Sequence, residues 1–301
     1  MISTQKVVML IRREVWENRS LWIAPLVLAG VILFAAAFGG VHFGQGDAPW
    51  FGHNAPETLN HLDAGQDKRS AIYGTAMATL TVIQLIVLGV VVFFYLLDAL
   101  LTERKDRSIL FWKSLPISDT EVVASKTLTG LVVAPLYVLA VSAVTQLLFG
   151  IVWYLRMGHS FPANLLVAFD GATWLQVQVA GLALVSTVVL WYLPIAAYLL
   201  LVSVWARKNA FLWAILPWVA LEMIEGLLMQ SHHIADFLAR RFGGVFLVMD
   251  LRDARTETPE LGEFLRHLGN VFVSGEMWLG ALAAAGIFFA VVRIRRYRDD
   301  S

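Results

Sequence analysis

Long runs of apolar residues, separated by polar connections, dominate this sequence. Six runs are long enough to cross the roughly 30 Å hydrocarbon core of a bilayer, since a helix rises about 1.5 Å per residue. We predict membrane spans over residues 21–40, 71–101, 127–154, 173–205, 210–230 and 276–292. The second and fourth runs exceed what a perpendicular helix needs, so those spans must tilt or extend into water.

The composition excludes a soluble protein. Of the 301 residues, 58% are hydrophobic and only 15% are charged, with a mean hydropathy of +0.68. A soluble domain carries about a quarter charged residues. We therefore predict an all-α integral membrane protein with one transmembrane domain over 1–301. The net charge of zero gives no indication of a nucleic-acid partner, and the absence of cysteine excludes disulfides, thiolate catalysis and cysteine-based metal sites.

Two segments outside the spans also have helical patterns. Residues 1–20 alternate apolar and basic side chains, which is typical of a helix at the membrane interface; a plain flanking tail is the alternative. Because the charged part extends to Arg19 and the apolar run beyond it is long, we do not expect a cleavable signal. Residues 231–275 form a longer connection in which Leu261, Phe264 and Leu268 follow helical spacing. We predict a partly helical segment there, before the last span.

The connection between the second and third spans has the most patterned polar sequence. We call residues 103–126 the polar insertion; they read ERKDRSILFWKSLPISDTEVVASK. Ser118 and Glu121 have the spacing of a capping box, which predicts a helix starting there and continuing into the third span. Trp112 and Lys113 favour a short amphipathic element at the lipid–water boundary. An ordinary solvated loop is the alternative.

The distribution of Lys and Arg predicts the orientation. Fifteen lie in the N-terminal stretch, the polar insertion, the 206–209 turn and the C-terminal tail, whereas eight lie in the three opposite connections. By the positive-inside rule, the polar insertion and both termini are expected in the cytoplasm.

The sequence contains no Walker-type phosphate loop and no HExxH motif, so it encodes neither ATP hydrolysis nor zincin chemistry. Glu222 and Glu225 lie one helical turn apart in the fifth span and are candidates for a translocation path, together with Asp98 near the end of the second span. The alternatives are that the fifth span ends early and both glutamates are interfacial, and that Asp98 pairs with a neighbouring base. His232 and His233 are more simply interpreted as solvated histidines than as metal ligands, so we expect no metal site.

The polar insertion, taken with six spans, resembles the permease subunits of ABC exporters of the type-2 export family. In both, a Glu-led charged cluster ends the second span, a Leu-Pro-Ile-Ser turn follows, and a Lys begins the third span. Arg107 and Ser108 stand where the family often has Gly-Thr. The residues that match the family pattern are Glu103, Arg104, Leu115, Pro116, Ser118 and Lys126.

This resemblance implies a transport subunit that is not itself an enzyme and that acts with a second permease copy or a paralogue in the inner membrane of a bacterium. ATP and Mg²⁺ would be bound by a separate ATPase subunit, and this chain would carry no cofactor. The polar insertion would be the coupling helix that contacts the ATPase. The coupling residues expected from the resemblance and the pattern are Glu103, Arg104, Lys105, Arg107, Trp112, Leu115, Pro116 and Ser118.

Two other classes of function stay open at this point. One is a self-contained membrane enzyme, and the other is a non-transporting membrane scaffold or immunity protein. A gene for a Walker-motif ATPase beside the gene for this chain, or copurification with such an ATPase, would separate a permease from both.

Overall fold

The computed structural model of this chain describes residues 4–38, 66–106, 117–157, 171–248 and 261–297. Within these ranges the regular elements are helices and no strand occurs. Six helical stretches are long and apolar enough to cross a membrane: Ser20–Phe38, Gly74–Lys105, Asp119–Val152, Gly171–Trp191, Ala210–Met229 and Gly275–Tyr297. The prediction of an all-α, multi-pass membrane protein is confirmed at this level.

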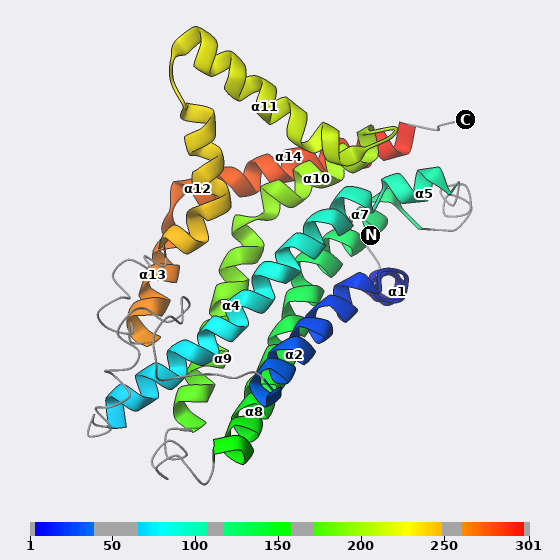
Figure 1. Cartoon of the computed structure of the whole chain (residues 1–301). Helices are drawn as coiled ribbons and strands as arrows, with labels where there is room; N and C mark the ends of the chain where they lie inside the picture. Colours follow the sequence, from blue (N-terminus) through cyan, green and yellow to red (C-terminus); the bar gives the residue numbers. More distant parts are fainter. Residues whose placement is uncertain (1–3, 39–65, 107–116, 158–170, 249–260, 298–301) are drawn as a thin grey trace.

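Most of these helices pack side by side along their length (Figure 1). One cluster of buried residues joins them, with Leu88, Leu200 and Val138 among its most enclosed members. The α10 helix and the last span, α14, form the most extensive pair. The helices of this bundle are α2 (Ser20–Phe38), α4 (Gln66–Asp98), α8 (Ala134–Met157), α9 (Gly171–Trp191), α10 (Leu193–Trp205) and α14 (Gly275–Tyr297).

Three shorter helices gather at one end of the bundle, where the last turns of α14 also lie (Figure 1). They are α1 (Thr4–Glu17), α5 (Leu101–Lys105) and α7 (Asp119–Leu128). The α7 helix packs against both α1 and α14. The first and last described helices thus approach the polar insertion from different sides.

The α7 helix begins as the sequence predicts. The Ser118 hydroxyl accepts a hydrogen bond from the Glu121 amide, and the Glu121 carboxylate accepts one from the Ser118 amide, so the capping box is confirmed. The helix continues through a π-helical turn, η1 (Thr129–Val133), into α8. Pro135 follows directly and has no N–H to donate, which accounts for the altered hydrogen bonding one turn ahead of it.

The fourth predicted span, over 173–205, consists of two helices in the structure, α9 and α10. The helix breaks at Tyr192, and α10 starts with Pro194 in its first turn. Proline cannot donate the backbone hydrogen bond that would continue α9, and its ring collides with the carbonyl one turn earlier. Hydropathy does not reveal this break because both sides of it are apolar.

The fifth span, α11 (Ala210–Met229), diverges from the bundle and forms a V-shaped hairpin with α12 (His233–Val248) (Figure 1). Gln230, at the turn between them, has a left-handed backbone with φ of 51°. A further helix, α13 (Leu261–Val273), packs on α9 and leads into α14. The described part of the 231–275 connection therefore contains two helices.

Inside the bundle a small polar layer joins three helices. Thr81 of α4 and Ser142 of α8 share a hydrogen bond of 2.8 Å between their hydroxyls. The Gln146 amide donates to the Thr81 hydroxyl at 2.8 Å and accepts from Gln178 of α9 at 2.8 Å. Hydrogen bonds between apolar helices fix their register, because each buried polar group needs a partner.

Candidate functional site: a buried charge network at the two ends of the polar insertion

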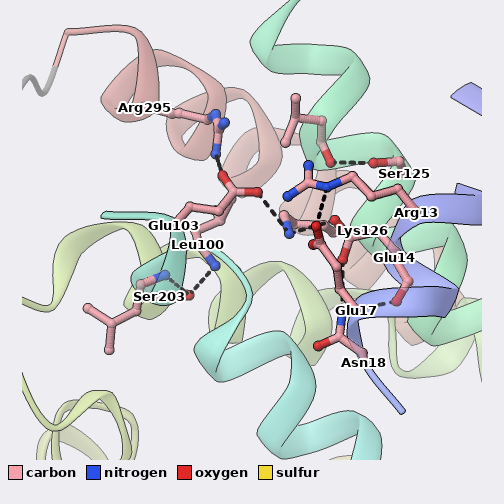
Figure 2. A network of polar contacts seen from close by, with 12 residues as sticks. Arg13, Glu14, Glu17, Asn18, Leu100, Glu103, Ser125, Lys126, Ser203 and Arg295 are labelled. Atoms are coloured by element: carbon pink, nitrogen blue, oxygen red, sulfur yellow. Dashed lines mark hydrogen bonds and ion pairs between the residues drawn. The ribbon is translucent and has the colours of Figure 1, made fainter. Parts of the chain in front are cut away.

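Glu103, near the start of the polar insertion, points into the protein. Its carboxylate contacts Lys126 Nζ at 3.0 Å through Oε1 and Arg295 Nη1 at 2.7 Å through Oε2. Figure 2 shows this carboxylate between the two cations. Lys126 comes from the far end of the insertion, on α7, and Arg295 from the last turns of α14. One carboxylate therefore joins both ends of the insertion to the last span.

A second carboxylate reaches Lys126 from the N-terminal helix. Glu14 Oε1 lies 2.8 Å from Lys126 Nζ, so the ammonium group stands between two acids (Figure 2). The other Glu14 oxygen accepts a hydrogen bond of 3.0 Å from the Tyr95 hydroxyl and one of 3.2 Å from the Asn18 side-chain amide. Glu14 is thus held by α1, α4 and α7 together.

Arg295 also contacts a third carboxylate. Its Nε donates to Asp119 Oδ1 at 2.9 Å while its Nη1 donates to Glu103. Asp119 and Lys126 lie about two helical turns apart on α7, which places them on one face of that helix. The α7 helix therefore presents an acid to α14 and a base to α1 and α5.

These five side chains form what we call the charge network: Glu14, Glu103, Asp119, Lys126 and Arg295. Glu14, Glu103, Lys126 and Arg295 are between 2% and 5% exposed. Charges so far from water are tolerated only when each has partners, and removing one partner of a buried pair costs about 3–5 kcal/mol. Because its members come from four helices that are distant in sequence, the network can hold those helices in one arrangement.

Two further contacts fix the helix that carries Glu103. The Ser203 hydroxyl, on α10, accepts hydrogen bonds from the amides of Leu100 and Leu101, at 2.9 and 3.1 Å. Arg104 Nη2 donates to the carbonyls of Ser203 and Ala206 at 2.8 and 2.5 Å. These carbonyls lie at the end of α10, where no helical partner remains for them. The start of the insertion is therefore anchored to α10 as well.

The structure places the predicted coupling residues in different surroundings. Glu103 is buried, so it lies inside the chain and not on the surface from which we expected it to pair with a partner. Arg104 is half-buried against α10, whereas Lys105 and Ser118 are exposed. Arg107, Trp112, Leu115 and Pro116 lie outside the described residues.

The predicted path residues Glu222 and Glu225 both lie against the start of α12. The Glu225 carboxylate accepts hydrogen bonds from the amides of His233 and Ile234 at 2.8 and 2.9 Å and from the Ser231 hydroxyl at 2.7 Å. Glu222 accepts from the Ala235 amide at 2.9 Å. Carboxylates at a helix N-terminus satisfy amides that have no helical partner.

These contacts give both glutamates a structural role in the α11–α12 hairpin, so their role on a path stays a prediction. Asp98, the third predicted path residue, is exposed at the end of α4. Arg104, a neighbouring base that could pair with Asp98, donates its hydrogen bonds to the end of α10. Within the described ranges, no group of three or more His, Asp or Glu side chains is arranged to hold a metal ion.

Sequence reasoning identified Glu103 and Lys126 but missed the other members of the network. Glu14 is an acid within a basic amphipathic helix, and Arg295 is one of several arginines in the C-terminal basic cluster. Nothing local distinguishes Glu14 from Glu17 on the same helix, or Arg295 from Arg293 and Arg296.

Comparisons with protein-family models, curated proteins and solved structures found no match to this chain. The function of this chain is therefore inferred from the geometry of the charge network and from the pattern of the polar insertion.

Proposed function

We propose that this chain is the membrane-spanning permease subunit of an ATP-driven ABC exporter of the type-2 export family. Its substrate path would form between two copies of the chain, or between this chain and a paralogue. A separate ATPase subunit would bind ATP and Mg²⁺, and this chain would contribute no catalytic residue and no cofactor.

The observation that carries the proposal is the contact between Glu103 and Lys126, which closes the polar insertion at its base. A partner that pushes on the insertion would move both ends together, because the two ends are joined by a buried ion pair. The same network would pass that movement to α1 through Glu14 and to α14 through Arg295. A rigid surface element attached to several spans is what a two-state transporter needs to couple a partner's closure to its own.

The proposed arrangement in the membrane follows from charge and from the grouping of the helices. The excess of Lys and Arg at the network end favours the cytoplasm for that end, in the inner membrane of a bacterium. There α1 would lie at the membrane interface and the polar insertion would contain the coupling helix. The α12 and α13 helices would form the outer segment before the last span.

Within the insertion we assign two different roles. Trp112 and Leu115 would make the apolar contacts to the ATPase, because large side chains at the centre of an interface carry most of the binding energy. Arg104, Lys105, Arg107, Pro116 and Ser118 would shape or flank that surface. Glu103 and Lys126 would be positioning residues that transmit its movement.

The test is copurification of this chain with the Walker-motif ATPase encoded beside its gene. We expect the wild-type chain to retain the ATPase, and Trp112→Ala to reduce its retention by about tenfold or more, as for a central interface residue. The matched control is Trp278→Ala, since Trp278 is an exposed tryptophan on α14, far along the chain from the insertion. Failure of the wild-type chain to retain the ATPase would reject the proposal.

A second measurement addresses the positioning role. Glu103→Gln should keep the ATPase bound but change the rate of ATP hydrolysis when the complex is placed in proteoliposomes, because the base of the insertion is loosened. Unchanged hydrolysis together with unchanged binding would remove Glu103 from the coupling mechanism.

A further inference from the structure

Arg241, in the middle of α12, is a buried cation that forms no ion pair with a described residue. The residue is 9% exposed, and its guanidinium lies over the Trp191 ring with Cζ 4.6 Å from the ring centroid. Nη2 is buried, and none of the described side chains or carbonyls accepts a hydrogen bond from it. The ion pairs of the described residues do not include Arg241. This contrasts with Arg295, whose charge is met by two carboxylates.

The position of Arg241 is built by several elements. The Trp191 indole N–H donates to the Arg241 carbonyl at 2.9 Å, and the Tyr192 hydroxyl donates to the Phe242 carbonyl at 2.6 Å. Both donors lie at the break between α9 and α10. On α14, Gly280 leaves room for the guanidinium, because a Cβ atom there would overlap Nη2. Arg241 is therefore fixed in a niche between α9, α12 and α14.

The niche holds the guanidinium without a hydrogen-bond acceptor for its buried Nη2 among the described residues. Burial lowers the pKa of Arg241 from its ordinary value, and attraction by Glu276 raises it again. An arginine stays protonated in either case. Stacking on tryptophan offsets part of the cost of burying the cation, but it provides no acceptor for the N–H groups. A buried charge without a hydrogen-bonded counter-ion is costly, so the niche favours an anion from outside the described chain.

The side chains around Arg241 indicate what kind of molecule bears that anionic group. Phe242, the neighbour of Arg241 on α12, is 51% exposed, and Leu279, the neighbour of Gly280 on α14, is 69% exposed. A ligand that satisfies the cation and also covers this apolar surface must combine an anionic group with hydrocarbon. We propose that the Arg241 niche binds the phosphate of a membrane phospholipid, whose acyl chains lie along α12 and α14. The planar guanidinium matches the geometry of phosphate oxygens.

The experiment measures lipid binding to delipidated, detergent-purified protein by native mass spectrometry and by the shift in thermal midpoint. Three probes are compared: a short-chain phosphatidylglycerol, the corresponding neutral diacylglycerol, and inorganic phosphate. The variant is Arg241→Gln, and Arg240→Gln is the matched control because Arg240 is the exposed neighbour on the same helix. We expect phosphatidylglycerol to bind the wild type and Arg240→Gln equally, and Arg241→Gln about tenfold more weakly, as for the loss of a charge-assisted hydrogen bond.

Gly280→Ala provides a second variant that keeps the arginine and raises helix propensity. It should displace the guanidinium and weaken phosphatidylglycerol binding even if Arg241→Gln fails to fold. Equal binding of phosphatidylglycerol to the wild type, Arg241→Gln and Gly280→Ala would overturn the proposal. Diacylglycerol that binds as tightly as phosphatidylglycerol would also overturn it, because the phosphate would then contribute nothing. Inorganic phosphate that reproduces the full thermal shift would reject a lipid as the source of the anion.

Discussion

Lys126 and Arg295 each contact two carboxylates that come from different helices. Lys126 is held between Glu14 and Glu103, and Arg295 between Glu103 and Asp119. Because Glu103 belongs to both pairs, the loss of one residue affects contacts across the whole network. Substituting a charge of the network should therefore lower the free energy of unfolding more than substituting an exposed charge close to it in sequence.

The sharpest comparison is between two adjacent arginines on α14. Arg295→Met leaves Glu103 with one cation fewer in a buried site, so we expect a loss of about 3–5 kcal/mol in the free energy of unfolding. Arg296 is exposed, and Arg296→Met should change it by about 0.5 kcal/mol or less. Reversible unfolding in mixed micelles measures both. Equal effects of the two substitutions would contradict the burial and pairing of Arg295.

His232 is expected to respond to pH through Glu222. The Glu222 carboxylate lies 2.9 Å from His232 Nδ1, and this hydrogen bond, with the charge attraction, raises the pKa of His232 above 6.5. Protonated His232 then stabilises the α11–α12 hairpin fully below the unfolded pKa. That stabilisation is lost as pH rises through the higher folded pKa.

An NMR titration of the His232 ring checks this. Glu222→Gln should return the pKa of His232 toward 6.5, whereas Glu263→Gln, which removes a carboxylate from α13, should leave it unchanged. A His232 titration that is the same in the wild type and in Glu222→Gln would show that the contact is absent in solution.

At the scale of elements, the α11–α12 hairpin depends on two glutamates of α11 that cap the start of α12. Glu225 accepts from two amides at the start of α12, and Gln230 makes the left-handed turn that brings the helices together. The α11 helix is the least buried of the six candidate spans, since only 11% of its most apolar stretch is buried. The position of α11 relative to α12 therefore depends largely on these caps.

Replacing Glu225 with Ala should increase amide hydrogen exchange at His233 and Ile234, because both N–H groups lose their acceptor. The helix cap contributes about 1 kcal/mol in typical cases, which corresponds to roughly fivefold faster exchange if exchange occurs by local opening. Exchange in α7 is the internal control and should not change. If exchange at the start of α12 is unaffected while transport is lost, Glu225 acts on a substrate path and not as a cap.

At the scale of the whole molecule, α1, α5, α7 and the last turns of α14, which carry the charge network, lie at one end of the bundle, with the start and end of the described chain (Figure 1). This agrees with an even number of crossings, and the six candidate spans provide that number. The side of the membrane on which this end lies depends on the Lys and Arg distribution, and it is open to a direct test.

The natural chain has no cysteine, so a single introduced cysteine reports its own accessibility. In intact cells, we expect a membrane-impermeant maleimide to label Ser160→Cys, in the connection before α9, but not Ser114→Cys, in the polar insertion. Ser114→Cys should become reactive after the membrane is permeabilised. Labelling of Ser114→Cys in intact cells would reverse the proposed orientation.

Much of the architecture followed from local properties of the sequence. The six spans depend on the lengths of apolar runs, and the start of α7 depends on the spacing between Ser118 and Glu121; neither requires knowledge of which helices meet. The polar insertion was recognisable for the same reason, since charge, turn and cap residues are adjacent in the chain. The break at Tyr192 is local as well, but the apolar sequence on both sides concealed it, and Pro194 was its only signal.

Only the tertiary structure decided which charges meet. Glu14 and Lys126 are far apart in sequence, and their contact exists because α1 packs against α7. The choice of Arg295 over its neighbours depends on which face of α14 turns toward α7, and the isolation of Arg241 depends on Gly280 and Trp191 from two other helices. The sequence thus determined the spans and where the chain is polar, because these properties are local. Helix packing determined which polar groups are buried and paired, because it alone removes them from water and brings distant residues within contact distance.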